Sequence, residues 1–329
     1  MKALPFLAAG LGVAAGAALV VYFGADAVWR SLSAVGWAGF AAVCAIHLAL
    51  IAAMGAAWWV LLPGTRAGVL VWARLVRDSG SEVLPLSQVG GYVLGARAAT
   101  LGGVSATAST ASTIVDVSLE FVAQLAYTAL GLFWLVHLRP GSAVAVPVSL
   151  GLVVAALAAA GCFVAQRRGF AAFDRLVRLL GRGWADKTAA GAAALHAALA
   201  AIYRLRGGLA LCFALHLAAW IASVVEPWLV LRLAGAPLPF GTVLTVECLL
   251  YATRSLAFFV PNAVGVQEGA YIVLGAGFGL GPEMALALSL LKRARDLVIG
   301  APALVVWQAI ENGRLWRRAR GGAPGVPRP

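Results

Sequence analysis

The chain has 329 residues, of which 62% are hydrophobic and only 12% are charged, with a net charge of +12. A soluble domain carries about twice that charged fraction, so the composition excludes a water-soluble protein and predicts an all-α polytopic membrane protein. The basic residues lie in short loops and near the C-terminus rather than on a soluble face, which argues against nucleic-acid binding.

The first apolar run, residues 4–23, follows Lys2 and resembles a signal peptide. It is long for a signal sequence and is followed by more apolar runs, so we expect an uncleaved first helix. Six further runs approach or exceed the roughly 20 residues that cross a bilayer as a helix. They are residues 36–62, 104–136, 143–165, 207–232, 240–260 and 283–310.

Two other apolar stretches, residues 83–103 and 262–281, are interrupted by glycines and start near a proline. Such segments are typical of broken or re-entrant helices that line protein or a wet cavity. Both contain a similar short sequence motif, which starts at Tyr92 in the first and at Tyr271 in the second. The match either indicates an internal pseudo-repeat or is due to chance. If 262–281 crosses, the chain has about eight transmembrane helices.

Lys and Arg in short loops predict the orientation, because they favour the cytoplasmic side. Residues 166–206 carry eight of them and the tail 313–329 is also basic, so both are expected in the cytoplasm. The same reasoning treats Arg66, Arg74 and Arg77 as a cytoplasmic loop and places both termini inside. Residues 1–312 then form one transmembrane domain, whose loop 166–206 is amphipathic and lies either on anionic headgroups or in solvent.

Several charged residues lie inside apolar segments, where each costs ~2.5–3.5 kcal/mol to insert. They must therefore pair with one another or face a wet cavity, and they are the candidates for a substrate path. The alternative is that they only hold helices together. The candidates are Arg97, Asp116, Glu120, Glu247, Arg254, Asn262, Gln267, Glu268, Arg293 and Asp296.

The stretch from Phe259 to Ala270 combines glycines with three polar side chains at membrane depth. Glycine lets backbones approach closely, and the start of a half-helix presents free amides to an anion. We therefore expect this stretch on the substrate path. Acidic residues such as Glu268 and Asp116 are also candidates to carry coupling protons.

Motifs of soluble enzyme chemistry are missing from the sequence, including metalloprotease, serine hydrolase and Walker patterns. The four histidines are isolated along the chain, so no metal site and no cofactor are expected, and the protein is not expected to be an enzyme. Each of the four cysteines lies in an apolar run and is expected to be a packing thiol.

Six short words resemble the membrane domain of lysylphosphatidylglycerol synthases, and within that superfamily the HpnL-like hopanoid-associated membrane proteins. The most specific is Phe259-Val-Pro-Asn-Ala-Val-Gly-Val-Gln-Glu-Gly269. The others lie at 72–79, 84–91, 95–97, 114–120 and 292–297, so the resemblance extends from Trp72 to Gln308. It implies a flippase-like fold whose relatives move a lipid between leaflets.

The function implied is a lipid translocator of the bacterial inner membrane, with a hopanoid or an anionic phospholipid as its partner. Lysyl-lipid synthesis is not implied, since no aminoacyl-transferase domain follows the last span. The alternatives are a non-transporting scaffold for lipid biosynthesis and a membrane enzyme that modifies a lipid. The sequence leaves open whether the chain forms a homo-oligomer.

Overall fold

The structure is a computed structural model that describes residues 25–84, 88–168, 182–257 and 260–321. These residues form helices and no strand, which confirms the all-α prediction. The first predicted span, 4–23, lies outside the described residues. Four helical stretches are long and apolar enough to cross a membrane, namely Leu32–Trp59, Ala106–Leu138, Ala145–Gln166 and Arg206–Leu233.

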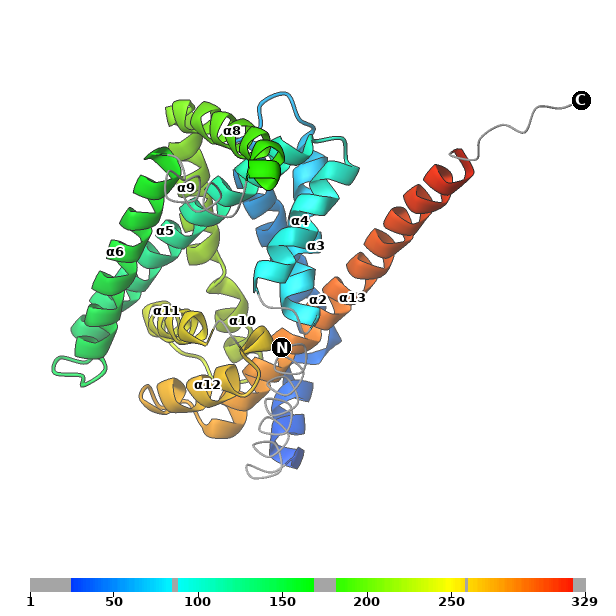
Figure 1. Cartoon of the computed structure of the whole chain (residues 1–329). Helices are drawn as coiled ribbons and strands as arrows, with labels where there is room; N and C mark the ends of the chain where they lie inside the picture. Colours follow the sequence, from blue (N-terminus) through cyan, green and yellow to red (C-terminus); the bar gives the residue numbers. More distant parts are fainter. Residues whose placement is uncertain (1–24, 85–87, 169–181, 258–259, 322–329) are drawn as a thin grey trace, which may run out of the picture.

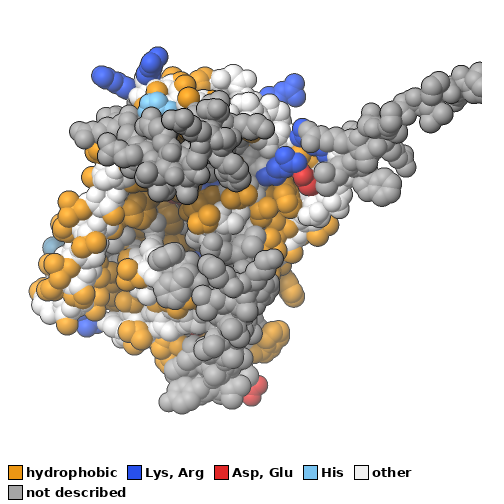
Figure 2. Space-filling view, viewed as in Figure 1, with side chains coloured by type: hydrophobic (Ala, Val, Ile, Leu, Met, Phe, Trp, Pro, Cys, Tyr) orange, Lys and Arg blue, Asp and Glu red, His pale blue; other side chains and the backbone are white. Residues whose placement is uncertain are grey.

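The membrane-facing character is clearest on α6 (Ala145–Arg168), where large hydrophobic side chains point away from the protein. Val154 and Leu157 are 67% and 68% exposed. Figure 2 shows hydrophobic side chains over much of the visible described surface, with Lys and Arg gathered mainly near its upper edge. An exposed apolar belt of this kind is stable only in lipid.

Two long helices, α5 (Ala106–Leu138) and α2 (Ala25–Trp59), form much of the framework. α5 packs against α6, the amphipathic α8 (Arg182–Arg204), α4 (Gln88–Leu101), α9 (Arg206–Ala222) and α11 (Phe240–Leu256). α2 packs against α9, α3 (Ala67–Val83), α10 (Val225–Leu233) and α13 (Pro282–Gly321). Ser105 caps the start of α5, since its hydroxyl accepts a hydrogen bond from the backbone N–H of Ala108. α2 is kinked at Gly36, whose φ of 65° leaves the helical region.

The predicted span 207–232 is divided into α9 (Arg206–Ala222) and α10 (Val225–Leu233). The break comes just before Pro227, which has no N–H to donate to the carbonyl of Ser223. The helix is therefore broken beside Glu226, whose side chain is buried in the bundle and 2% exposed.

Two helical hairpins are built from helices of at most 17 residues, the lower limit of the length that crosses a bilayer. The first consists of α3 (Ala67–Val83) and α4 (Gln88–Leu101). The second consists of α11 (Phe240–Leu256), the short turn η1 (Pro261–Ala263) and α12 (Val266–Ala276). The structure thus forms no continuous helix over all of 83–103 or 262–281, and α11 is shorter than the span expected over 240–260. That these two segments re-enter the membrane stays a prediction.

The glycines of the first segment do not break it. α4 is a continuous helix, and its glycines allow it to lie directly against α3. A Cβ atom on Gly91 would lie 1.9 Å from Ser81 Oγ, and one on Gly95 would lie 2.7 Å from Arg77 Cβ. The expectation of a glycine-interrupted helix was wrong here because these glycines serve close packing rather than a change of backbone direction.

A repeated order of helix lengths supports the internal pseudo-repeat. α3 and α11 have 17 residues each, the short helices α4 and α12 have 14 and 11, and the long helices α5 and α13 (Pro282–Gly321) have 33 and 40. Tyr92 of α4 and Tyr271 of α12 each carry a cation over the ring, Arg77 at 4.6 Å and Lys292 at 5.5 Å. The C-terminal part of α13 extends away from the other helices (Figure 1).

Candidate functional site: a charged cavity inside the bundle

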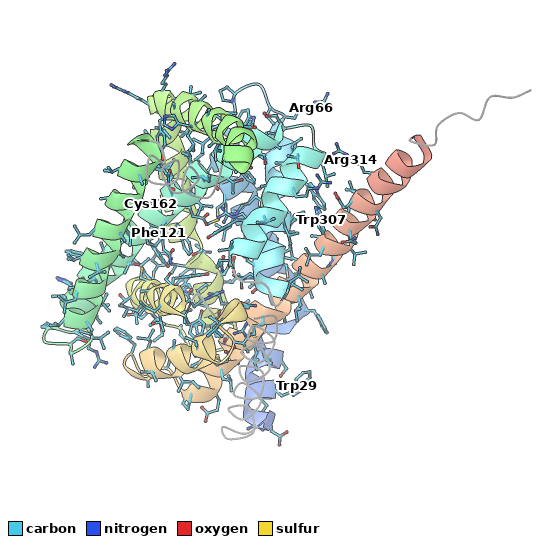
Figure 3. The ribbon with its side chains drawn as sticks, in the orientation of Figure 1. Trp29, Arg66, Phe121, Cys162, Trp307 and Arg314 are labelled. Atoms are coloured by element: carbon cyan, nitrogen blue, oxygen red, sulfur yellow. The ribbon has the colours of Figure 1, made fainter. Side chains whose placement is uncertain are left out.

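A cavity of about 380 Å³ lies among the two hairpins and the long helices. Its wall combines apolar and aromatic residues with charged side chains of both signs. Phe121, labelled in Figure 3, belongs to this wall and comes from α5. The charged residues that line the cavity are Arg74, Arg77, Asp78, Glu82, Glu120, Glu226, Arg254, Lys292, Arg295 and Asp296.

One wall of the cavity is an ion-pair network between α3 and α5. Arg74 donates from Nη2 to Glu120 at 2.7 Å and from Nε to Asp78 at 2.7 Å. Arg77 donates to Asp116 at 2.7 Å and also to Glu120. Both arginine side chains are 4% exposed. Arg74 and Arg77 are therefore buried partners of acids on α3, and the expectation that they lie in a loop was wrong.

Asp116 lies one layer behind the cavity wall, in a cluster with Cys212 and His216. His216 Nε2 is 2.9 Å from Asp116 Oδ1, and the three possible ligand atoms lie within 4.8 Å of one another. The expectation that the histidines are isolated was wrong for His216, because folding brings α9 beside α5. The cation of Arg77 on the same carboxylate opposes a metal ion, so the cluster fits a hydrogen-bonded anchor for Arg77.

The opposite wall comes from α13 and its neighbours. Lys292 donates to Glu247 Oε2 at 2.8 Å and to the hydroxyl of Tyr271 at 2.9 Å, and that hydroxyl donates to Glu247. Glu247 is 1% exposed. The charge of Lys292 is therefore neutralised inside the protein by a carboxylate from α11.

Arg295 and Asp296 form a second group on this wall. Arg295 donates to Glu226 and, at 2.7 Å, to Asp296. His47 of α2 bridges the two acids, with Nδ1 3.1 Å from Glu226 and Nε2 3.9 Å from Asp296. This group ties α13 to α2 and α10 at the edge of the cavity.

The tips of the two hairpins meet across the cavity. Arg254, near the end of α11, donates from Nη2 to both carboxylate oxygens of Glu82 at 2.9 Å. The same nitrogen donates to Asn262 Oδ1 at 3.2 Å, and the amide of Asn262 donates to the backbone carbonyl of Glu82. This contact therefore joins the first hairpin to the second.

The turn that carries Asn262 is strained, since Asn262 and Ala263 have φ values of 49° and 46°. Positive φ is unfavourable for alanine and persists only where the surroundings enforce it. Arg293 does so by donating to the carbonyl of Asn262 at 3.3 Å and to Glu268. Glu268 in turn accepts from the backbone N–H of Gly265 at 2.7 Å, which caps α12.

The predicted site residues therefore fall into separate groups. Glu120, Arg254, Asn262 and Asp296 line the cavity. Asp116 and Glu247 stand behind it as ion-pair partners of lining residues. Gln267, Glu268 and Arg293 hold the strained turn, Gln267 through a 2.8 Å bond to Ser289. Arg97 lies apart, paired with Glu311 of α13.

Several cavity residues were missing from the predicted set. The α3 residues Arg74, Asp78 and Glu82 are four apart and Arg77 is three after Arg74, a helical spacing that could have indicated them. Lys292 and Arg295 are likewise three apart on α13, whereas His47 and Glu226 have no such local pattern.

Residues 7–303 match the model of the lysylphosphatidylglycerol synthase transmembrane region. The chain belongs to this family. The family and the apolar helices make it a multi-pass membrane protein of lipid metabolism or transport. Comparison with curated proteins and with solved structures gave no match. The cavity is thus a polar compartment within a lysylphosphatidylglycerol synthase transmembrane region.

Proposed function

We propose that the protein is a flippase-like translocator that moves a lipid between the leaflets of the bacterial inner membrane. The observation that carries this proposal is the charged cavity of about 380 Å³ inside a bundle whose outer surface is apolar. A lipid headgroup needs such a compartment, because moving it through hydrocarbon removes its bound water at a large cost in free energy. The acyl chains stay in the surrounding bilayer while the headgroup passes between the hairpins.

The cavity supports transport better than covalent chemistry. The acids that the described residues place there are engaged with cations, as Glu120 is with Arg74 and Arg77. A general acid or base needs a proton to exchange with substrate, whereas these carboxylates balance fixed charge. We therefore propose a non-enzymatic function with no cofactor, and with both termini in the cytoplasm. The candidate cargoes are a hopanoid, as HpnL-like proteins imply, and a phospholipid.

The test is leaflet exchange of labelled lipids in liposomes that contain the purified chain. Labelled hopanoid and phospholipid are followed with the wild type and with Arg254→Gln, Glu268→Gln and Arg293→Ala. Arg232→Gln is the matched control, since Arg232 is exposed. Among the described side-chain contacts it makes only one, with its guanidinium carbon 4.1 Å from the centre of the Trp228 ring.

We expect faster exchange with the wild type and with the control, slower exchange with the three variants, and an unchanged lipid mass. A changed lipid mass would favour an enzyme. Absence of exchange under any ion gradient would contradict the translocator and favour a scaffold for lipid biosynthesis.

A further inference from the structure

The charges around the cavity do not balance. Five cations line it, and the acids that line it or pair directly with a lining cation number seven among the described residues. With neutral histidines, two negative charges are in excess. The acids are Asp78, Glu82, Asp116, Glu120, Glu226, Glu247 and Asp296. At low dielectric such an excess disfavours a headgroup with a net negative charge and attracts a positive group.

Two of the seven acids are the most accessible to a ligand. The side chains of Asp78 and Glu82 are each 24% exposed, whereas that of Glu120 is 13% exposed. They lie one turn apart on α3, where Cβ atoms are about 5–6 Å apart, and both side chains line the cavity. Asp78 pairs with Arg74 alone among the described ion pairs, and Arg74 also holds Glu120. A ligand ammonium is therefore able to bind Asp78 without leaving Arg74 unpaired.

An anion-binding group stands beside these acids. A guanidinium has five N–H donors, but the hydrogen bonds that the described residues make with Arg254 use only Nη2. Its Nε and Nη1 are thus available for a phosphate oxygen. Arg254 lies 2.9 Å from Glu82, and Glu82 lies about one helical turn from Asp78 on α3. A phosphate bound to Arg254 is therefore about one helical turn from an ammonium bound to Asp78.

We propose that this cavity selects a zwitterionic headgroup, with its phosphate on Arg254 and its primary ammonium between Asp78 and Glu82. Phosphoethanolamine has this chemistry and this spacing of charges. The carboxylates favour a primary ammonium over a quaternary one because only the former has N–H donors. The inference rests on the proposed function, and it disfavours the anionic phospholipid, which is one of the two partners expected from the sequence.

The first test compares leaflet exchange of lipids with one labelled acyl chain and different headgroups, namely phosphatidylethanolamine, phosphatidylcholine and phosphatidylglycerol. We expect the wild type to exchange phosphatidylethanolamine about tenfold faster than phosphatidylglycerol, as one charged hydrogen bond would give. Asp78→Asn should remove this preference while Arg74 keeps Glu120. Glu283→Gln, on α13 and away from the cavity, should keep it.

The second test measures binding without transport, as the rise in melting temperature of the purified chain with short-chain lipids. Short-chain phosphatidylethanolamine should raise the melting temperature more than phosphatidylglycerol, and Asp78→Asn should abolish the difference. Exchange or binding that favours phosphatidylglycerol or phosphatidylcholine would overturn the inference. Selective binding of phosphatidylethanolamine without exchange of any lipid would uphold the inference and contradict the translocator.

Discussion

The buried pair between Lys292 and Glu247 gives a sharp test of how the bundle is held together. Their side chains are 5% and 1% exposed, 2.8 Å apart, and joined by Tyr271. Lys292→Met leaves a buried carboxylate without its cation, which costs about 3–5 kcal/mol. For a chain of this size, that corresponds to a fall in melting temperature of about 6–20 °C.

The assay is thermal unfolding in detergent of the single variants and of the double variant Lys292→Met with Glu247→Gln. The double variant should recover more than half of the loss, because it removes both charges. Glu311→Gln is the comparison, since its partner Arg97 is 39% exposed and such pairs contribute at most about 1 kcal/mol. If Lys292→Met melts within about 2 °C of the wild type, a shift well below the expected one, the reasoning is refuted.

Three further outcomes follow from the packing and the ion pairs. Gly91→Ala should destabilise the protein by about 1–3 kcal/mol in the same assay because its Cβ has no room, whereas Gly151→Ala on α6 meets no atom within 4 Å and should not. Glu268→Gln should slow lipid exchange by the same factor at every pH, because Glu268 holds Arg293; a shifted pH profile would instead indicate proton coupling. Zn²⁺ or a chelator should leave the melting temperature unchanged, because the cluster of Asp116, Cys212 and His216 is not expected to bind a metal. If Zn²⁺ raises the melting temperature of the wild type but not that of Asp116→Asn, the cluster is a metal site.

The fold class was predictable from the sequence because long apolar runs have few alternatives in a bilayer. Breaks were predictable where proline removes a donor, as before Pro227, and where a turn combines proline with glycine, as around Asn262. The role of Gly91 was not predictable, because the same residue permits either a bend or a close contact. Only the neighbouring α3 decides between them.

The site was predictable only in part, since intramembrane charge identifies residues but not their partners. Glu120 and Arg254 were expected from their charge, and both line the cavity. Glu268 has the same charge as Glu120 and also lies in an apolar segment of the sequence, yet it caps α12 away from the cavity wall. His47 contacts Glu226, which is 179 positions away, and no local pattern in the sequence encodes such a contact.

The central claim, that lipid headgroups pass through the cavity, is tested most directly by blocking the cavity. Ser255 lines it and is exposed, so Ser255→Cys in a chain freed of its four native cysteines offers a single reactive site. Gly151→Cys on the outer face of α6 is the control. We predict that a bulky thiol reagent stops lipid exchange in the Ser255→Cys protein and leaves the control unaffected. Exchange that continues at the same rate after complete labelling of Ser255→Cys would contradict the account.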